Sequence, residues 1–301
     1  MFEVLAKSAR AAREARPFAA ESLFGATGTL LALTLIVTVP ALALDDRELR
    51  GENVWIKPIR FQIALSVYFL TLAYFARWLP AGMTQGRVYR GFAYVIVAAV
   101  VAEIVWIAGA AAMGVGSHYN VSTPTTAWLY SAMGVAAVVL TSASLVYGIA
   151  IWRAPAWEKR DSIRQAVALG LVLTFALTVP VAGYLSAFAP ADVKSAGVQV
   201  PNADALDTAL GWSRPAGGLR TAHFLATHAL HVLPLLGLAL AFATSAARAR
   251  LAIRAGAVVY AGLVIAVFAA AIAGEPALTT PASQKGGMQG AVAPQYAAPG
   301  R

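Results

Sequence analysis

Seven long apolar runs are the feature of this sequence that most constrains its fold. Each is about as long as the ~20 residues that an α-helix needs to cross the hydrocarbon core of a bilayer. The chain is 59% hydrophobic and only 12% charged, whereas soluble domains carry about 25% charged residues. Transmembrane β-barrels show ~10-residue segments of alternating hydrophobicity, and this sequence lacks them. We therefore predict an all-α integral membrane protein with seven transmembrane helices, at approximately 22–44, 58–79, 91–115, 126–152, 164–189, 220–246 and 255–274.

The two ends of the chain differ from this apolar body. In residues 1–20, Lys7, Arg10 and Arg13 fall on one side of a helix that Pro17 ends. This pattern predicts an interfacial amphipathic segment, with a partly disordered basic tail as the alternative. Residues 276–301 are rich in Pro, Gly, Gln and Ala, which predicts a disordered tail. The transmembrane domain would then cover 21–275.

The charge distribution predicts the orientation. With the N-terminus in the cytoplasm, 14 basic residues fall on the cytoplasmic side and 9 outside. The positive-inside rule therefore favours a cytoplasmic N-terminus and an external C-terminus. The net charge of +9 is explained by these loops, so we expect the lipid bilayer, and not nucleic acid, as a partner. Although 41–43 (Ala-Leu-Ala) resembles a signal-peptidase site, the run before it spans fully, so we expect a retained helix.

The arginine and lysine counts bear on the source of the protein, and the cysteine count limits the chemistry that it can perform. Arginine outnumbers lysine 18 to 5 and alanine is abundant, which favours a bacterial source and hence the bacterial cytoplasmic (inner) membrane. The chain has no cysteine, which excludes disulfides, thiol catalysis and thiolate metal ligands.

An internal repeat is also indicated. Residues 31–40 (LALTLIVTVP) and 171–180 (LVLTFALTVP) are identical at six of ten positions. Both segments run from inside to outside, so a duplication would give a parallel 3+1+3 arrangement, a plan that recurs in transporters. Chance similarity between apolar segments is the alternative. We expect the threonines of both segments, Thr34, Thr38, Thr174 and Thr178, to bond to their own helices.

The sixth run contains three of the four histidines within a single stretch of nine residues, at His223, His228 and His231. Ionisable side chains at bilayer depth are rare and are usually functional. With a rise of 1.5 Å per residue, His223 falls in the first turn from the outer end, His228 about 12 Å down and His231 about 16 Å down. At ~100° per residue the three share one broad face, which predicts a common site in the outer half.

Glu103 and His118 extend this predicted site. Glu103 lies near the middle of the third run, at a depth similar to that of His231, and this pair predicts a proton relay or a stabilising ion pair. The alternative is a protonated Glu103 that bonds a neighbouring helix. His118 lies in the outer loop after the third run, at the same boundary as His223. Two imidazoles from different segments are what a haem iron takes as axial ligands, and His118, His223 and His228 are equally suited to a transition-metal ion.

Basic residues open the second and sixth runs at the predicted outer face. Arg60 and Arg220 stand near these helix N-termini, where the helix dipole adds to their positive field. We predict that they hold an anionic group, such as a haem propionate or a carboxylated substrate. The alternative is that their side chains extend to lipid headgroups.

Together these patterns predict a multi-pass membrane protein whose outer-half, histidine-lined site binds haem b or a transition metal for membrane redox chemistry or electron transfer. His118, His223 and His228 would be ligands, while Glu103 and His231 would carry protons. One alternative is a proton-coupled transporter or permease of a small anionic solute, with Glu103 and His231 as the coupling pair. Another is a cofactor-free structural membrane protein. The sequence leaves open whether the protein is an enzyme.

Overall fold

The computed structural model describes residues 22–49, 51–154, 162–188 and 219–273. Within these ranges seven helices are long and apolar enough to cross a membrane, so the predicted all-α, multi-pass architecture is confirmed. The helices are α2 (Ser22–Leu44), α3 (Ile56–Phe75), α4 (Arg87–Ala112), α5 (Pro124–Arg153), α6 (Ser162–Phe188), α9 (Leu219–Ala243) and α10 (Ala246–Ile272). Two short strands, β1 (Glu48–Leu49) and β2 (Glu52–Asn53), form a hairpin between α2 and α3, and two 3₁₀ turns, η1 (Ala76–Trp78) and η2 (Met83–Gln85), join α3 to α4.

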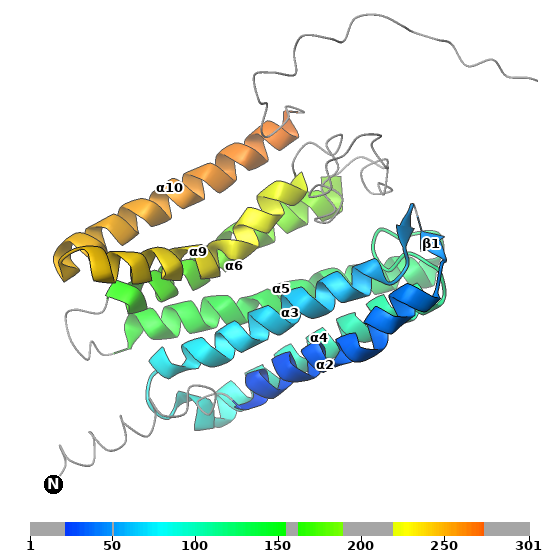
Figure 1. Ribbon diagram of the computed structural model, residues 1–301, viewed down its shortest axis with the longest axis horizontal. Helices are drawn as coiled ribbons and strands as arrows, with labels where there is room; N and C mark the ends of the chain where they lie inside the picture. The colour runs from blue at the N-terminus through cyan, green and yellow to red at the C-terminus, as the bar shows by residue number, and fades with distance from the viewer. Residues whose placement is uncertain (1–21, 50, 155–161, 189–218, 274–301) are drawn as a thin grey trace, which may run out of the picture.

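Consecutive helices alternate in direction (Figure 1). The β1–β2 hairpin lies at one end of the bundle, which we call the hairpin end. There α2, α4, α6 and α10 finish and α3, α5 and α9 begin. Across the bundle, α2 and α4 lie beside α3 and α5, followed by α6 with α9 and then by α10 (Figure 1). The start of α9, which carries three histidines, therefore shares the hairpin end with the loop between α4 and α5.

Glycines allow several of these helices to approach closely. A Cβ atom added to Gly28 of α2 would lie 3.0 Å from the carbonyl oxygen of Ser66 in α3. One added to Gly148 of α5 would lie 2.9 Å from the carbonyl oxygen of Ala168 in α6. Small residues at helix interfaces are typical of membrane proteins, where close packing replaces the hydrophobic effect between helices.

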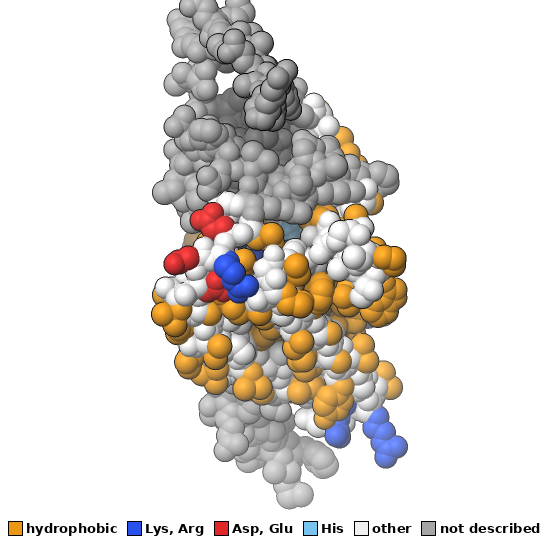
Figure 2. Space-filling model, turned by 90° about the vertical axis from the view of Figure 1, so that its right-hand side faces the viewer, with side chains coloured by type: hydrophobic (Ala, Val, Ile, Leu, Met, Phe, Trp, Pro, Cys, Tyr) orange, Lys and Arg blue, Asp and Glu red, His pale blue; other side chains and the backbone are white. Residues whose placement is uncertain are grey.

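The outward faces of the helices carry large apolar side chains. Ile36 and Val37 of α2 are each 70% exposed, and Val258 of α10 is 73% exposed. Seen from the hairpin end, charged side chains gather on the end face while apolar side chains cover the flanks (Figure 2). Such a distribution suits helices whose sides contact lipid and whose ends contact water.

The main difference from the predicted boundaries lies between the last two helices. α10 begins at Ala246, nine residues before the predicted start at 255, and only residues 244–245 separate it from α9. Arg248, Arg250 and Arg254 therefore belong to the helix and not to a loop. Arginine has a high helix propensity, and its long side chain reaches water from a helix end.

The described residues leave three predictions untested: the terminal segments, the orientation across the membrane and the parallel repeat. Segments 1–20 and 276–301 lie outside the described residues. The orientation across the membrane stays a prediction. So does the parallel repeat, although in both predicted triplets the first two helices, α2 with α3 and α6 with α9, pack along each other.

Candidate functional site at the hairpin end of α9

His228 is held in one orientation by its own helix. Its Nδ1 lies 2.7 Å from the carbonyl oxygen of Phe224, one turn earlier, and its ring stacks on the Phe224 ring at a centroid distance of 3.9 Å. A carbonyl oxygen only accepts hydrogen bonds, so Nδ1 is the protonated nitrogen in this arrangement. The lone pair of the neutral ring is then on Nε2.

His231 links α9 to α3. Its Nε2 lies 3.1 Å from the hydroxyl of Thr71, and its ring centroid lies 5.7 Å from that of His228. His223 and His231 are both close enough to His228 to interact with it electrostatically. The structure thus brings the three histidines of α9 together on one face, which we call the α9 histidine face (His223, His228 and His231).

His118 lies in the loop between α4 and α5 and packs among aromatic rings. Its Nδ1 is 3.1 Å from the hydroxyl of Ser117, and its ring centroid is 5.5 Å from that of Phe61 in α3. Burial, with a smaller contribution from the nearby ammonium of Lys57, lowers the pKa of His118 to about 3. The imidazole is therefore neutral near pH 7, which is the form that binds a metal.

The next residue of this loop connects it to α9. Tyr119 has a φ of 56°, a left-handed conformation that is uncommon outside glycine. Its ring centroid lies 5.2 Å from that of Tyr130 in α5. Burial and, to a smaller extent, the neighbouring Tyr130 raise the pKa of Tyr119 to about 12, although the guanidinium of Arg220 opposes the rise. Lys57 and Arg220 thus bring two positive charges near residues 118–119.

Arg60 has a different environment from the one predicted for an anion clamp. It forms an ion pair with Glu52 of β2, with a distance of 3.2 Å between Nη1 and Oε2. The hairpin carboxylate therefore neutralises part of the charge that Arg60 brings to this end. The other predicted clamp residue, Arg220, lies near Tyr119.

Within the described part of the chain, no hydrogen bond or ion pair links Glu103 to His231. Glu103 is only 4% exposed, and its carboxyl has no hydrogen bond or ion pair among the described residues. It lies nine residues from the end of α4 at the hairpin end, or about 14 Å, whereas His231 lies twelve residues from the start of α9, or about 18 Å. The hydrogen-bond partner of His231 is Thr71 instead.

The described residues do not form a complete set of protein ligands for a metal ion. Among them no three His, Cys, Asp or Glu side chains come together as a group able to hold an ion. The predicted ligands His118, His223 and His228 therefore do not by themselves make a three-ligand centre within the described ranges. Any metal at this end would need further ligands from a cofactor, from water or from the rest of the chain.

Sequence reasoning missed Thr71, Tyr119 and Tyr130. Thr71 is one of many threonines in the apolar runs, and only helix packing reveals that it faces His231. The two tyrosines adjoin predicted elements, but nothing in their spacing indicates that their rings meet.

No protein-family model, curated protein or solved structure matches this chain. Its seven apolar helices and their exposed apolar flanks define a multi-pass helical membrane protein. Within it, the hairpin end combines the α9 histidine face, a neutral loop histidine and two nearby cations.

Proposed function

We propose that this protein binds haem b, or a transition metal in its place, at the hairpin end of α9 and serves membrane redox chemistry or electron transfer. The observation that carries the proposal is the hydrogen bond from His228 Nδ1 to the Phe224 carbonyl. Metal-ligating histidines commonly donate one ring nitrogen to a carbonyl, which fixes the ring and leaves the other nitrogen for the metal. His228 Nε2 is the proposed ligand atom.

Haem is favoured over a bare ion by the number of protein ligands that it needs. A haem iron needs two axial ligands at most, whereas structural and catalytic metal ions usually take three or more from the protein. Among the described residues no three-ligand group exists. His118 would hold the haem from the loop between α4 and α5, and His228, or His223 in its place, would hold it from α9.

The positive charges at the hairpin end suit the propionate groups of a haem. Lys57 and Arg220 lie near the loop at 118–119, where cations pair with carboxylates such as propionates through charge-assisted hydrogen bonds. Bound haem would supply one-electron chemistry. The protein would orient the imidazoles, and its nearby cations would neutralise the propionates.

An absorption spectrum of the detergent-purified protein, with metal analysis, tests this proposal. We expect a Soret band at near-stoichiometric haem, which the substitution His228→Ala removes. The matched control is His231→Gln, because the glutamine amide can still bond Thr71 and the proposed ligand is untouched. Purified protein with neither a Soret band nor stoichiometric metal, after haem has been supplied during growth, would rule the proposal out.

A second candidate is the proton-coupled transport of a small anion, favoured by the buried carboxyl of Glu103, which has no hydrogen bond or ion pair within the described ranges. Carboxyls inside membrane-spanning helices commonly form part of proton relays in pumps and transporters. Proton-coupled uptake into vesicles should then be lost on Glu103→Gln. Uptake that survives this substitution would exclude this version of the mechanism.

A further inference from the structure

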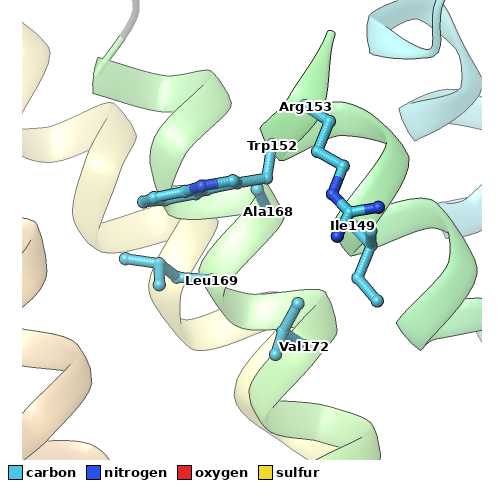
Figure 3. A pocket seen from close by; sticks show the side chains of 6 residues that line it. All are labelled: Ile149, Trp152, Arg153, Ala168, Leu169 and Val172. Carbon is cyan, nitrogen blue, oxygen red and sulfur yellow. The ribbon is translucent and has the colours of Figure 1, made fainter.

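A groove between α5 and α6 lies at the end of the bundle opposite the hairpin. It has a volume of about 300 Å³ and is lined by Ile149, Trp152, Arg153, Ala168, Leu169 and Val172. In Figure 3 the Trp152 indole lies across the groove above Leu169, while Arg153 extends on the side of Ile149. The groove is independent of the α9 histidine face and of the function proposed for it.

The groove has a local structural cause. α5 and α6 touch at Gly148, where an added Cβ atom would lie 2.9 Å from the carbonyl oxygen of Ala168 and 2.8 Å from Val172 Cγ2. The larger side chains that follow on α5 project on either side of this contact. A hollow with apolar walls therefore remains beside the point of closest approach.

The two arginines at this end have different roles. Arg164 of α6 donates hydrogen bonds from Nε and Nη2 to the carbonyl oxygen of Ile151, at 3.1 and 2.7 Å, and from Nη2 to that of Ala154. It thereby caps the C-terminus of α5. Arg153 is exposed, lines the groove and has no hydrogen bond or ion pair among the described residues.

We propose that this groove binds an anionic phospholipid, with an acyl chain along Ile149, Leu169 and Val172 and the headgroup phosphate at Arg153. The apolar walls lie on two membrane-crossing helices, and the cation stands at their end, so the groove has the polarity of one lipid molecule. Basic pockets between transmembrane helices bind anionic headgroups. Trp152, which is 55% exposed, belongs to the aromatic residues that favour the membrane–water interface.

Lipid binding to the delipidated, detergent-purified full chain, measured by native mass spectrometry, tests this inference. The probes are phosphatidylglycerol and phosphatidylcholine with identical acyl chains. We expect phosphatidylglycerol to bind more tightly, and Arg153→Gln to weaken it about fivefold, the effect of one basic residue near an anionic surface. The matched control is Arg90→Gln, which removes an exposed arginine at the start of α4 and should leave binding unchanged.

A second substitution tests the apolar part of the groove. Ile149→Trp fills the hollow from its exposed side, and we expect it to weaken both lipids while the protein still elutes as a folded species in size-exclusion chromatography. Equal binding of the two lipids to the native chain, or equal losses in Arg153→Gln and Arg90→Gln, would overturn the inference. Displacement of the lipid by inorganic phosphate alone would indicate a simple anion site and would also overturn it. So would a change of oligomeric state in Ile149→Trp without loss of lipid, since a second copy would then cover the groove.

Discussion

A buried hydrogen bond between α2 and α3 illustrates what single polar residues do in this bundle. The Thr38 hydroxyl donates to Gln62 Oε1 at 2.7 Å, and the two residues are 5% and 2% exposed. In a lipid-surrounded bundle no water can replace a lost partner, so the amide would remain unsatisfied. This bond therefore fixes how the two helices face each other as well as adding to stability.

Thr38→Val should lower the free energy of unfolding by about 1–2 kcal/mol, because it leaves the Gln62 amide without its donor. Thr29→Val is the matched control, since the Thr29 hydroxyl is exposed and, among the described residues, bonds only to its own helix, to Gly25 O at 2.9 Å. Unfolding of the purified protein by SDS, followed by circular dichroism, measures both. Equal losses in the two variants would show that the interhelical bond contributes nothing specific.

His118 gives the protein a stability that depends on pH. Its pKa is about 3 in the folded chain, chiefly through burial, against about 6.5 when exposed. Between pH 6.5 and 3 the unfolded chain therefore binds a proton that the folded chain does not, and stability falls as the pH falls through this window. His118→Gln should flatten the fall, as measured by unfolding at pH 7.5, 5.5 and 4.5.

Asp45 provides an internal control at lower pH. The guanidinium of Arg47 and the indole N–H of Trp55 hold the pKa of this carboxyl well below its usual range. Its contribution is complete above about pH 4, the ordinary carboxyl pKa, and is lost only as the pH falls further. Asp45→Asn should therefore leave the loss between pH 7.5 and 4.5 intact. A steep loss that persists in His118→Gln and disappears in Asp45→Asn would contradict both assignments.

Among the elements, the contact of α6 with α9 depends on Gly170. A Cβ atom added there would lie 2.8 Å from the carbonyl oxygen of Ala229, and backbone atoms cannot move aside without shifting a helix. Gly170→Ala should therefore destabilise the protein by about 1–3 kcal/mol. Gly183→Ala, in the same helix, meets nothing within 4 Å and should be neutral or stabilising. SDS unfolding compares the two, and a harmless Gly170→Ala would mean that the helices can separate at little cost.

The sequence predicts the helices well but their packing partners poorly. The seven helices follow from the length and polarity of single segments, and Gln62 and Glu103 are conspicuous because they interrupt apolar runs. Helix partners require packing that no single segment contains. Thr34 and Thr174 bond to their own helices as expected, at 2.6 and 2.8 Å, but the shorter bond of Thr38 goes to Gln62 in α3. The expectation is wrong for Thr178, whose buried hydroxyl has no hydrogen-bond partner among the described residues.

For the candidate site, too, the sequence predicts what lies within one helix but not the contacts between helices. The clustering of three histidines on α9 is already present in their spacing of five and three residues, because helical geometry alone places them on one face. The predicted pairing of Glu103 with His231 rests on depth alone. Depth does not fix the rotation of a helix or its neighbours, and the hydrogen bond that His231 Nε2 makes among the described residues is with the Thr71 hydroxyl.

At the scale of the whole molecule, orientation is the prediction on which the physiological meaning of both proposed sites depends. The hairpin end should face outward, because the arginine-rich opposite end carries Arg87, Arg90, Arg153, Arg164, Arg248, Arg250 and Arg254. The chain has no cysteine, so single cysteines can be introduced without background. Val121, 66% exposed in the loop at the hairpin end, and Ala81, exposed between η1 and η2 at the other end, are suitable positions.

We expect Val121→Cys to react with a membrane-impermeant maleimide in intact cells, and Ala81→Cys to react only after the membrane is permeabilised. Both side chains are accessible in the folded protein, so unequal labelling would report the side of the membrane and not burial. The cysteine-free chain controls for non-specific labelling. The reverse pattern would place the histidines of α9 in the cytoplasmic half and the α5–α6 groove in the outer leaflet. A haem at the hairpin end would then exchange electrons with cytoplasmic partners, because electron transfer to the outside would have to cross the full length of the bundle.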